Sequence, residues 1–231
     1  SSQVSPAVNR IVLKRKIWQD VLRLAAIKKL SGNTDLLSEI NMSTTVTKQK
    51  EKDNKETKQE NEIDEEGIFV QHAGLVLVHP FLPSLFKRLE LITEGKFIDT
   101  PSQQKAICLL HYIVAGTTAA QEYELVVPKI LCEWPLQMPV ERDSELSKDE
   151  LNEADNMLQA VIEQWTVLKN TSVEGLREGF LQRKGKLFSK NDNLHLQAET
   201  NSIDVLLDQL PWNLSMIKLP WMKKILRLEW R

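Results

Sequence analysis

The stretch SKDELNEADNMLQAVIEQW, residues 147–165, carries the most complete helix signal in the chain. Ser147 and Glu150 form a capping box, in which each side chain accepts a hydrogen bond from the other residue's backbone at a helix start. Apolar residues then recur at intervals of three or four positions, as on one face of an amphipathic helix. These residues are Leu151, Ala154, Leu158, Val161, Ile162, Trp165 and Leu168. The stretch therefore predicts a long helix that buries one face.

Two more helices are indicated on either side of this stretch. Residues 100–103 indicate a helix start, with Thr100 as the cap, a proline at the first helical position and a glutamine three residues after the cap. Gly116 marks the end of that helix. Residues 171–174 repeat the capping pattern, so another helix is expected there. Its buried side chains are expected to be Leu176, Phe180 and Leu181.

Strand signals lie at the two ends of this helical region. Residues 68–78 are too apolar for a surface element, and periodicity leaves open a strand or a buried helix. Residues 186–189 and 194–198 flank a turn-forming Asn-Asp-Asn and predict a hairpin, with further strands in the tail. Residues 67–231 are therefore expected to form a compact α+β domain, mainly α, with a small antiparallel sheet near the C-terminus.

The N-terminal part of the chain has a different composition. Residues 1–32 predict a basic amphipathic helix, with seven Lys and Arg against Asp20 between residues 8 and 30. Its apolar stripe includes Trp18, Val21 and Leu22. Residues 33–66 predict a disordered charged linker, because they contain too little apolar surface to offset the entropy of ordering. An amphipathic helix of this kind either docks on another protein or lies on an anionic membrane or nucleic acid.

Overall composition excludes several classes of protein. The chain of 231 residues has a formal net charge of −2, which argues against a whole-protein electrostatic fit to nucleic acid. The apolar run that ends before His79 and Pro80 is far shorter than the roughly 20 residues a membrane span needs. The first ten residues have no apolar segment typical of a secretory signal.

Motifs for catalysis or cofactor binding are not found in the sequence. It has no Gly-x-Ser-x-Gly elbow and no phosphate-binding glycine loop. Cys108 and His111 share a helix face, but a zinc site would need two more ligands from His72, His79 or Cys132, whose spacings do not pair. The favoured interpretation is that Cys108 packs in the core and His111 makes a local hydrogen bond. We therefore predict no catalytic, cofactor or metal site.

Four segments carry a resemblance to a known family. They are AGLVLVHPFL (73–82), KNTSVEGLREGFLQR (169–183), DVLLDQLPW (204–212) and IKLPWM (217–222). Together they resemble the C-terminal domain of the tape measure proteins of extracellular contractile injection systems, which are phage-tail-like particles. The second segment is the most specific of the four. His72 departs from the pattern, where asparagine is expected, and this affects only a local cap or turn.

The resemblance implies a structural assembly protein that controls tube length or anchors or plugs the tube at the baseplate end. It implies the inner tube and the baseplate or spike proteins as partners, with several copies acting together and neither a small-molecule substrate nor nucleic acid. It also implies the bacterial cytoplasm during assembly and then the particle. The predicted helix and linker are short for a tube ruler, so the chain is expected to be a terminal piece of a longer ruler or a compact anchor, plug or adaptor.

The candidate partner-binding residues are Trp18, Val21, Leu22, Arg177, Trp212 and Trp221. Trp212 and Trp221 follow prolines and can be core plugs or interface anchors, and Arg177 can equally belong to the core. An alternative function is a basic-helix module that binds nucleic acid or anionic membrane, with residues 67–231 as a regulatory domain. Steep weakening of binding by salt would favour this alternative. An enzyme that uses Cys108 and His111 is the least favoured hypothesis.

Overall fold

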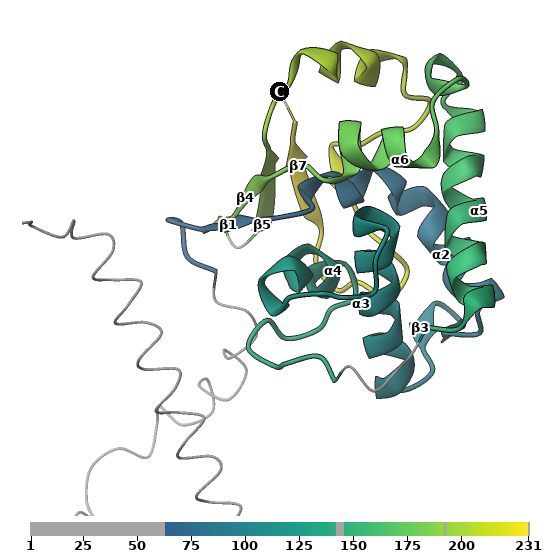
Figure 1. Ribbon diagram of the computed structural model, residues 1–231. Helices are drawn as coiled ribbons and strands as arrows, with labels where there is room; N and C mark the ends of the chain where they lie inside the picture. The colour runs from purple at the N-terminus through teal and green to yellow at the C-terminus, as the bar shows by residue number, and fades with distance from the viewer. Residues whose placement is uncertain (1–62, 142–145, 192, 231) are drawn as a thin grey trace, which may run out of the picture. The chain divides into compact units, whose positions relative to one another are not determined.

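The structure is a computed structural model that describes residues 63–141, 146–191 and 193–230 (Figure 1). We refer to these residues as the packed domain. The predicted basic helix, with Trp18, Val21 and Leu22, lies outside the described residues. Ile63 is buried, and Asp64 accepts a backbone hydrogen bond from Ser189 at 3.1 Å. Within the packed domain no helix is long and apolar enough to cross a membrane.

The packed domain combines helices with a five-stranded sheet, which confirms the predicted α+β class. In the view of Figure 1 helix α5 lies along one edge, the sheet lies at the opposite edge, and α2, α3 and α6 lie between them. The helical segments are η1 (Ala73–Phe81), α2 (Leu82–Arg88), α3 (Thr100–Ala115), η2 (Glu122–Leu125), α4 (Val126–Leu131), α5 (Lys148–Gln164), η3 (Thr166–Leu168), α6 (Val173–Leu176), η4 (Arg177–Leu181) and η5 (Ser202–Gln209).

The apolar run at residues 68–78 contains both of the elements that the sequence left open. Strand β1 (Ile68–Val70) is followed by η1, a 3-10 helix whose residues 73–78 are all buried. Segment η1 contacts the sheet through β5 and also contacts α2, α3, α4 and α5. It therefore runs through the core and joins the sheet to the helices.

Helix α3 begins one residue earlier than predicted. Asp99 is the cap, and its carboxylate accepts a hydrogen bond from Ser102 N at 2.7 Å, while Thr100 is already helical. The physical reason is that the carboxylate of Asp99 satisfies a free backbone N–H group of the first turn, and Pro101 is tolerated at either of the first helical positions. Gly116 ends the helix in the left-handed conformation, with φ of 71°, as expected.

The predicted capping box of α5 is confirmed. Ser147 N donates to Glu150 Oε2 at 2.7 Å, and Glu150 N donates to Ser147 Oγ at 3.2 Å. Trp165 is fully buried and donates from Nε1 to the carbonyl oxygen of Leu206 at 3.3 Å. The spacing placed Leu168 on the same helix, but it lies in η3, because the backbone of Trp165 leaves the helical region with ψ of 79°.

The helix expected after residue 171 is shorter and less regular than the sequence pattern predicted. Ser172 caps α6 by accepting from Gly175 N at 3.1 Å, and α6 ends at Leu176. The chain then continues as the π-helix η4, which a hydrogen bond from Gln182 N to the carbonyl oxygen of Arg177 closes at 2.9 Å. A π-turn has no distinctive sequence pattern, so the sequence predicted only a continuous helix.

The sheet is mixed, which corrects the antiparallel sheet that was predicted. The hairpin and the tail strands are present, but β5 and β7 pair in parallel. The physical reason is that about 27 residues separate these two strands, and a connection of that length allows the chain to return in the same direction. The strand order is β1-β4-β5-β7-β6, with β4 (Gly185–Lys190), β5 (Asn193–Ala198), β6 (Met216–Ile217) and β7 (Leu226–Glu229); β2 (Ile92–Thr93) and β3 (Lys96–Phe97) form a separate ladder.

Candidate functional site

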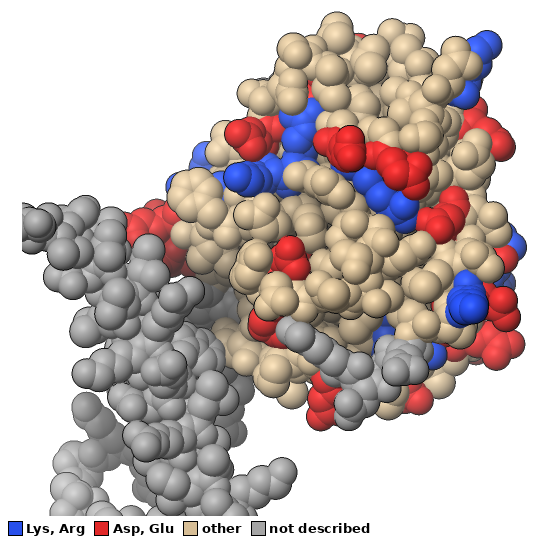
Figure 2. All heavy atoms as spheres, viewed as in Figure 1, with Lys and Arg blue, Asp and Glu red and all other residues tan. Residues whose placement is uncertain are grey.

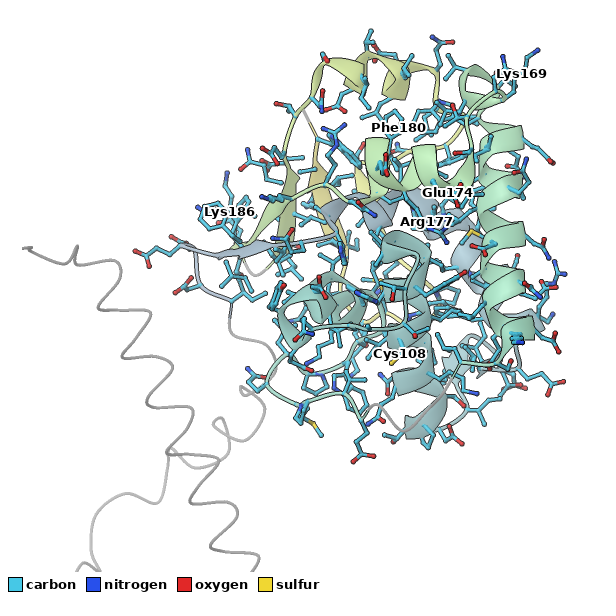
Figure 3. The ribbon with its side chains drawn as sticks, viewed as in Figure 1. Cys108, Lys169, Glu174, Arg177, Phe180 and Lys186 are labelled. Carbon is cyan, nitrogen blue, oxygen red and sulfur yellow. The ribbon has the colours of Figure 1, made fainter. Side chains whose placement is uncertain are left out.

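Arg177, a predicted contact residue, points into the packed domain. It is the first residue of η4 and is only 6% exposed. Its Nε donates to the carbonyl oxygen of Ile113 in α3 at 3.1 Å, and Nη2 donates to Asp155 Oδ1 in α5 at 2.6 Å. Figure 3 shows the side chain between these helices. The guanidinium group therefore joins three helical segments.

Tyr112 completes the polar cluster around Arg177. Its hydroxyl donates to Asp155 Oδ2 at 2.8 Å, and the guanidinium carbon of Arg177 lies 5.3 Å from the centroid of the Tyr112 ring. Burial, and then the hydrogen bond to Asp155, raise the pKa of Tyr112. Nε and Nη2 of Arg177 both donate inside the domain, and its role as a partner-binding residue stays a prediction.

Trp212 and Trp221 are half-buried and donate hydrogen bonds to buried segments. Trp212 Nε1 donates to the carbonyl oxygen of Leu77 in η1 at 2.9 Å, and Trp221 Nε1 donates to that of Leu131 in α4 at 2.8 Å. The ring of Trp221 stacks on Phe86 with centroids 5.3 Å apart. These contacts support the core-plug interpretation of both residues. Contact with a partner through their exposed faces stays a prediction.

Replacing Trp221 by phenylalanine is expected to lower stability by about 1 kcal/mol, because the indole donor is lost and the Leu131 carbonyl is left buried beside an apolar ring. For a domain of this size that corresponds to a fall in Tm of roughly 2–4 °C in a thermal melt. Tyr123→Phe is the control, because Tyr123 is 63% exposed. An unchanged Tm for Trp221→Phe would show that the hydrogen bond to Leu131 is not stabilising.

A buried ion pair joins two of the segments that carry the family resemblance. Arg183 Nη2 donates to Asp204 Oδ1 at 2.8 Å, and the two side chains are 8% and 6% exposed. Arg183 also donates to the carbonyl oxygen of Gly179 at 2.8 and 3.1 Å and to that of Glu199 at 3.2 Å. Asp204 Oδ2 accepts from Asn201 N at 2.7 Å at the start of η5. The pair therefore holds η5 against the end of η4.

Three exposed apolar residues on the edge strands of the sheet were not among the predicted contacts. Ile68 and Phe69 in β1 are 40% and 90% exposed, and Met216 in β6 is 53% exposed. Strands β1 and β6 are the two edge strands of the five-stranded sheet. The sequence offered only a misleading signal for Phe69, because it lies near the start of an apolar run whose residues 73–78 form part of the core. Edge strands with exposed apolar side chains are typical places for pairing with another chain.

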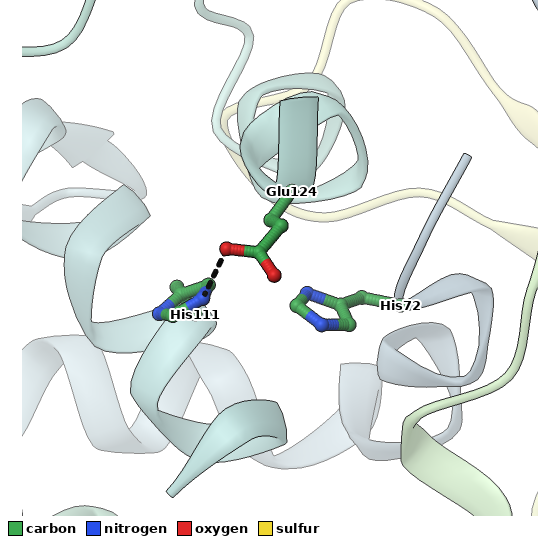
Figure 4. A group of neighbouring side chains, drawn as sticks. All are labelled: His72, His111 and Glu124. Atoms are coloured by element: carbon green, nitrogen blue, oxygen red, sulfur yellow. Dashed lines mark ion pairs between the residues drawn. The ribbon is translucent and has the colours of Figure 1, made fainter. Parts of the chain in front are cut away.

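His111 lies beside a different set of residues from the one weighed in the sequence. Its neighbours are His72 and Glu124, and one potential ligand atom from each of the three residues lies within 4.8 Å of the others (Figure 4). The predicted local hydrogen bond is present, between His111 Nδ1 and the Thr117 carbonyl oxygen at 3.1 Å. Cys108 is partly buried and packs against the core, rather than in it as predicted. The sequence did not indicate Glu124, because local spacing does not relate it to either histidine.

The candidate residues that the structure describes, Arg177, Trp212 and Trp221, all make hydrogen bonds within one packed α+β domain. The family model for contractile injection system tape measure proteins matches residues 7–230, which is nearly the whole chain. The chain therefore belongs to the contractile injection system tape measure protein family, and the resemblance carried by the four segments is confirmed. It is a structural protein of an injection particle. No curated protein and no solved structure gives a significant match.

Proposed function

We propose that the packed domain anchors the chain at one end of the inner tube, at the baseplate, and that it does not itself measure tube length. The observation that carries the proposal is that most of the family match falls on a packed domain with a continuous core. The longest helix described, α5, has 17 residues and extends about 26 Å. A ruler needs an extended element, whereas an anchor needs a folded body with a binding surface.

The edge of strand β1 is our candidate for the binding surface of this anchor. Within the packed domain β1 pairs only with β4, and Phe69 is the most exposed of the large apolar side chains. A strand from a tube or baseplate protein can add to such an edge, with backbone hydrogen bonds giving affinity and the Phe69 side chain giving an apolar anchor. Because tubes and baseplates are cyclic assemblies, we expect several copies of the chain to act together.

The charge distribution supports recognition of a protein rather than of a polyanion by this domain. On the face shown in Figure 2, Lys and Arg lie close to Asp and Glu and do not form a large patch of one sign. Binding to nucleic acid or to an anionic membrane typically requires a large patch of positive charge. Trp18, Val21 and Leu22 on the predicted basic helix remain our candidates for a second contact.

Deletions in bacteria that produce the particle test the anchor against the ruler. We expect removal of residues 63–231 to abolish tube formation, and removal of residues 33–62 to leave tube length unchanged in electron micrographs. If residues 33–62 belong to the ruler, tubes shorten by about 45 Å if the segment is helical and about 100 Å if it is extended. Such shortening, or tubes of uncontrolled length without residues 63–231, would contradict the proposal.

A further inference from the structure

Two buried histidines and one glutamate converge from three separate elements. His72 precedes η1, His111 lies near the end of α3, and Glu124 lies in η2. The residues His72 and His111 are 7% and 1% exposed, and the centroids of their rings are 5.4 Å apart. Figure 4 shows the carboxylate of Glu124 lying between the two rings.

The hydrogen bond of His111 determines which ring nitrogen carries the proton and which one presents a lone pair to the cluster. Nδ1 lies 3.1 Å from the carbonyl oxygen of Thr117, and because a carbonyl only accepts, Nδ1 must carry the proton. In the neutral ring, Nε2 then presents its lone pair to Glu124 Oε2 at 3.4 Å. A lone pair facing a carboxylate is repulsive unless a proton or a metal cation lies between them. An Nδ1–H group bonded to a backbone carbonyl is also the usual arrangement of a metal-ligating histidine.

His72 adds a second unused nitrogen to the cluster. Its Nδ1 is buried and has no hydrogen-bond partner within the described residues, as is also true of His111 Nε2. A buried polar atom without a partner costs about 1–3 kcal/mol. The backbone of His72 is in the left-handed region with φ of 63° and makes no side-chain cap. Strained backbone and an unsatisfied buried group are both features of functional sites.

We propose that His72, His111 and Glu124 bind one divalent transition-metal ion of the Zn²⁺ class, through His72 Nδ1, His111 Nε2 and the Glu124 carboxylate. Two histidines and one glutamate are a known zinc ligand set, with a water molecule in the remaining position. Zn–N and Zn–O bonds near 2.1 Å give a ligand separation of about 3.4 Å in a tetrahedron. The His111–Glu124 separation already has this value. The other separations in the cluster are at most 4.8 Å, so the side chains would have to move closer by up to about 1.4 Å to bind the ion.

The ion would tie together three segments that are far apart in the sequence, at the entry to the buried helix η1. Glu124 is the most accessible of the three residues, with 23% of its side-chain surface exposed. Its Oε2 also accepts from Gln121 N at 2.7 Å, which holds the carboxylate in place. The bound ion would therefore cross-link these three segments within the domain.

Titration of the full chain with Zn²⁺ after removal of metals by a chelator tests the site. We expect one ion per chain by isothermal titration calorimetry, and visible absorption bands of a tetrahedral complex when Co²⁺ replaces Zn²⁺. At a free Zn²⁺ concentration 100 times the Kd, Tm should rise by roughly 5–10 °C. Absence of stoichiometric binding, or binding without a rise in Tm, would overturn the proposal.

Three variants separate this site from surface binding. His72→Asn removes the imidazole but keeps a residue that tolerates a left-handed backbone, and Glu124→Gln keeps an oxygen that can accept from Gln121 N. We expect both of these variants to weaken Zn²⁺ binding at least about 10-fold and, at the same Zn²⁺ concentration, to reduce the metal-dependent rise in Tm by about half or more. His195→Asn is the matched control, because His195 lies on β5 beside Glu229. Melting without metal shows that each variant is folded. Wild-type affinity in both cluster variants, or loss of binding in His195→Asn, would refute the site.

Discussion

Replacing Gly74 by alanine is expected to prevent the packed domain from folding. A Cβ at this position would lie 1.8 Å from the Phe180 carbonyl oxygen and 2.8 Å from Leu181 Cα. These are backbone atoms of η4, so no side-chain rotation can relieve the overlap, and η1 would have to move away from its buried position. We expect insoluble protein, or protein without a cooperative thermal transition in circular dichroism.

Gly179→Ala is the matched control for Gly74→Ala. Gly179 lies in η4, close to the same contact, but its added Cβ would meet only the Ile203 Cδ1 atom, at 3.4 Å. That atom is the end of a flexible side chain, and alanine is favoured over glycine in a helical segment by up to about 1 kcal/mol. We therefore expect a folded protein with a Tm close to that of the wild type. A Tm for Gly74→Ala within a few degrees of the wild type would contradict the packing described here.

The contact at Gly74 gives a physical reason why two distant segments of the chain together carried the family resemblance. Gly74 belongs to the first segment, and Phe180 and Leu181 belong to the second, about 105 residues later. Sequence reasoning could find each segment but not their contact. Local features were predictable because they depend only on nearby residues. Ser147, Ser172 and Gly116 act on backbone groups within four residues of themselves.

Features that depend on distant parts of the chain were not predicted. The parallel pairing of β5 with β7 depends on the path of residues 199–225, and the π-turn at Arg177 has no local pattern. The histidine cluster shows the same limit. Spacing placed Cys108 and His111 on one helix face, yet His72 and Glu124 reach His111 only through the tertiary fold. The prolines beside Trp212 and Trp221 indicated rigid corners, whereas the carbonyl groups that accept from the two indoles could be identified only in the structure.

Replacing Asp204 by alanine is expected to lower the free energy of unfolding by about 3–5 kcal/mol, because it leaves the buried charge of Arg183 without its carboxylate. The Gly179 and Glu199 carbonyl groups still accept from Arg183, but they do not neutralise it. The cap that Asp204 supplies to Asn201 N at the start of η5 is also lost. Urea unfolding monitored by tryptophan fluorescence measures the change, with the slope of the transition as a check on two-state behaviour.

A double-mutant cycle shows whether this loss arises from the ion pair or from the cap. Arg183→Met alone leaves the Asp204 carboxylate buried without its arginine, whereas Arg183→Met with Asp204→Ala removes both charges. If the ion pair dominates, the double variant is more stable than either single variant, because a buried pair replaced by apolar side chains is often tolerated. Glu153→Ala is the control: its partner Arg88 has a side chain that is 67% exposed, so a change of 1 kcal/mol or less is expected. Strictly additive effects at Arg183 and Asp204 would instead assign the stabilisation to the cap and to the carbonyl contacts.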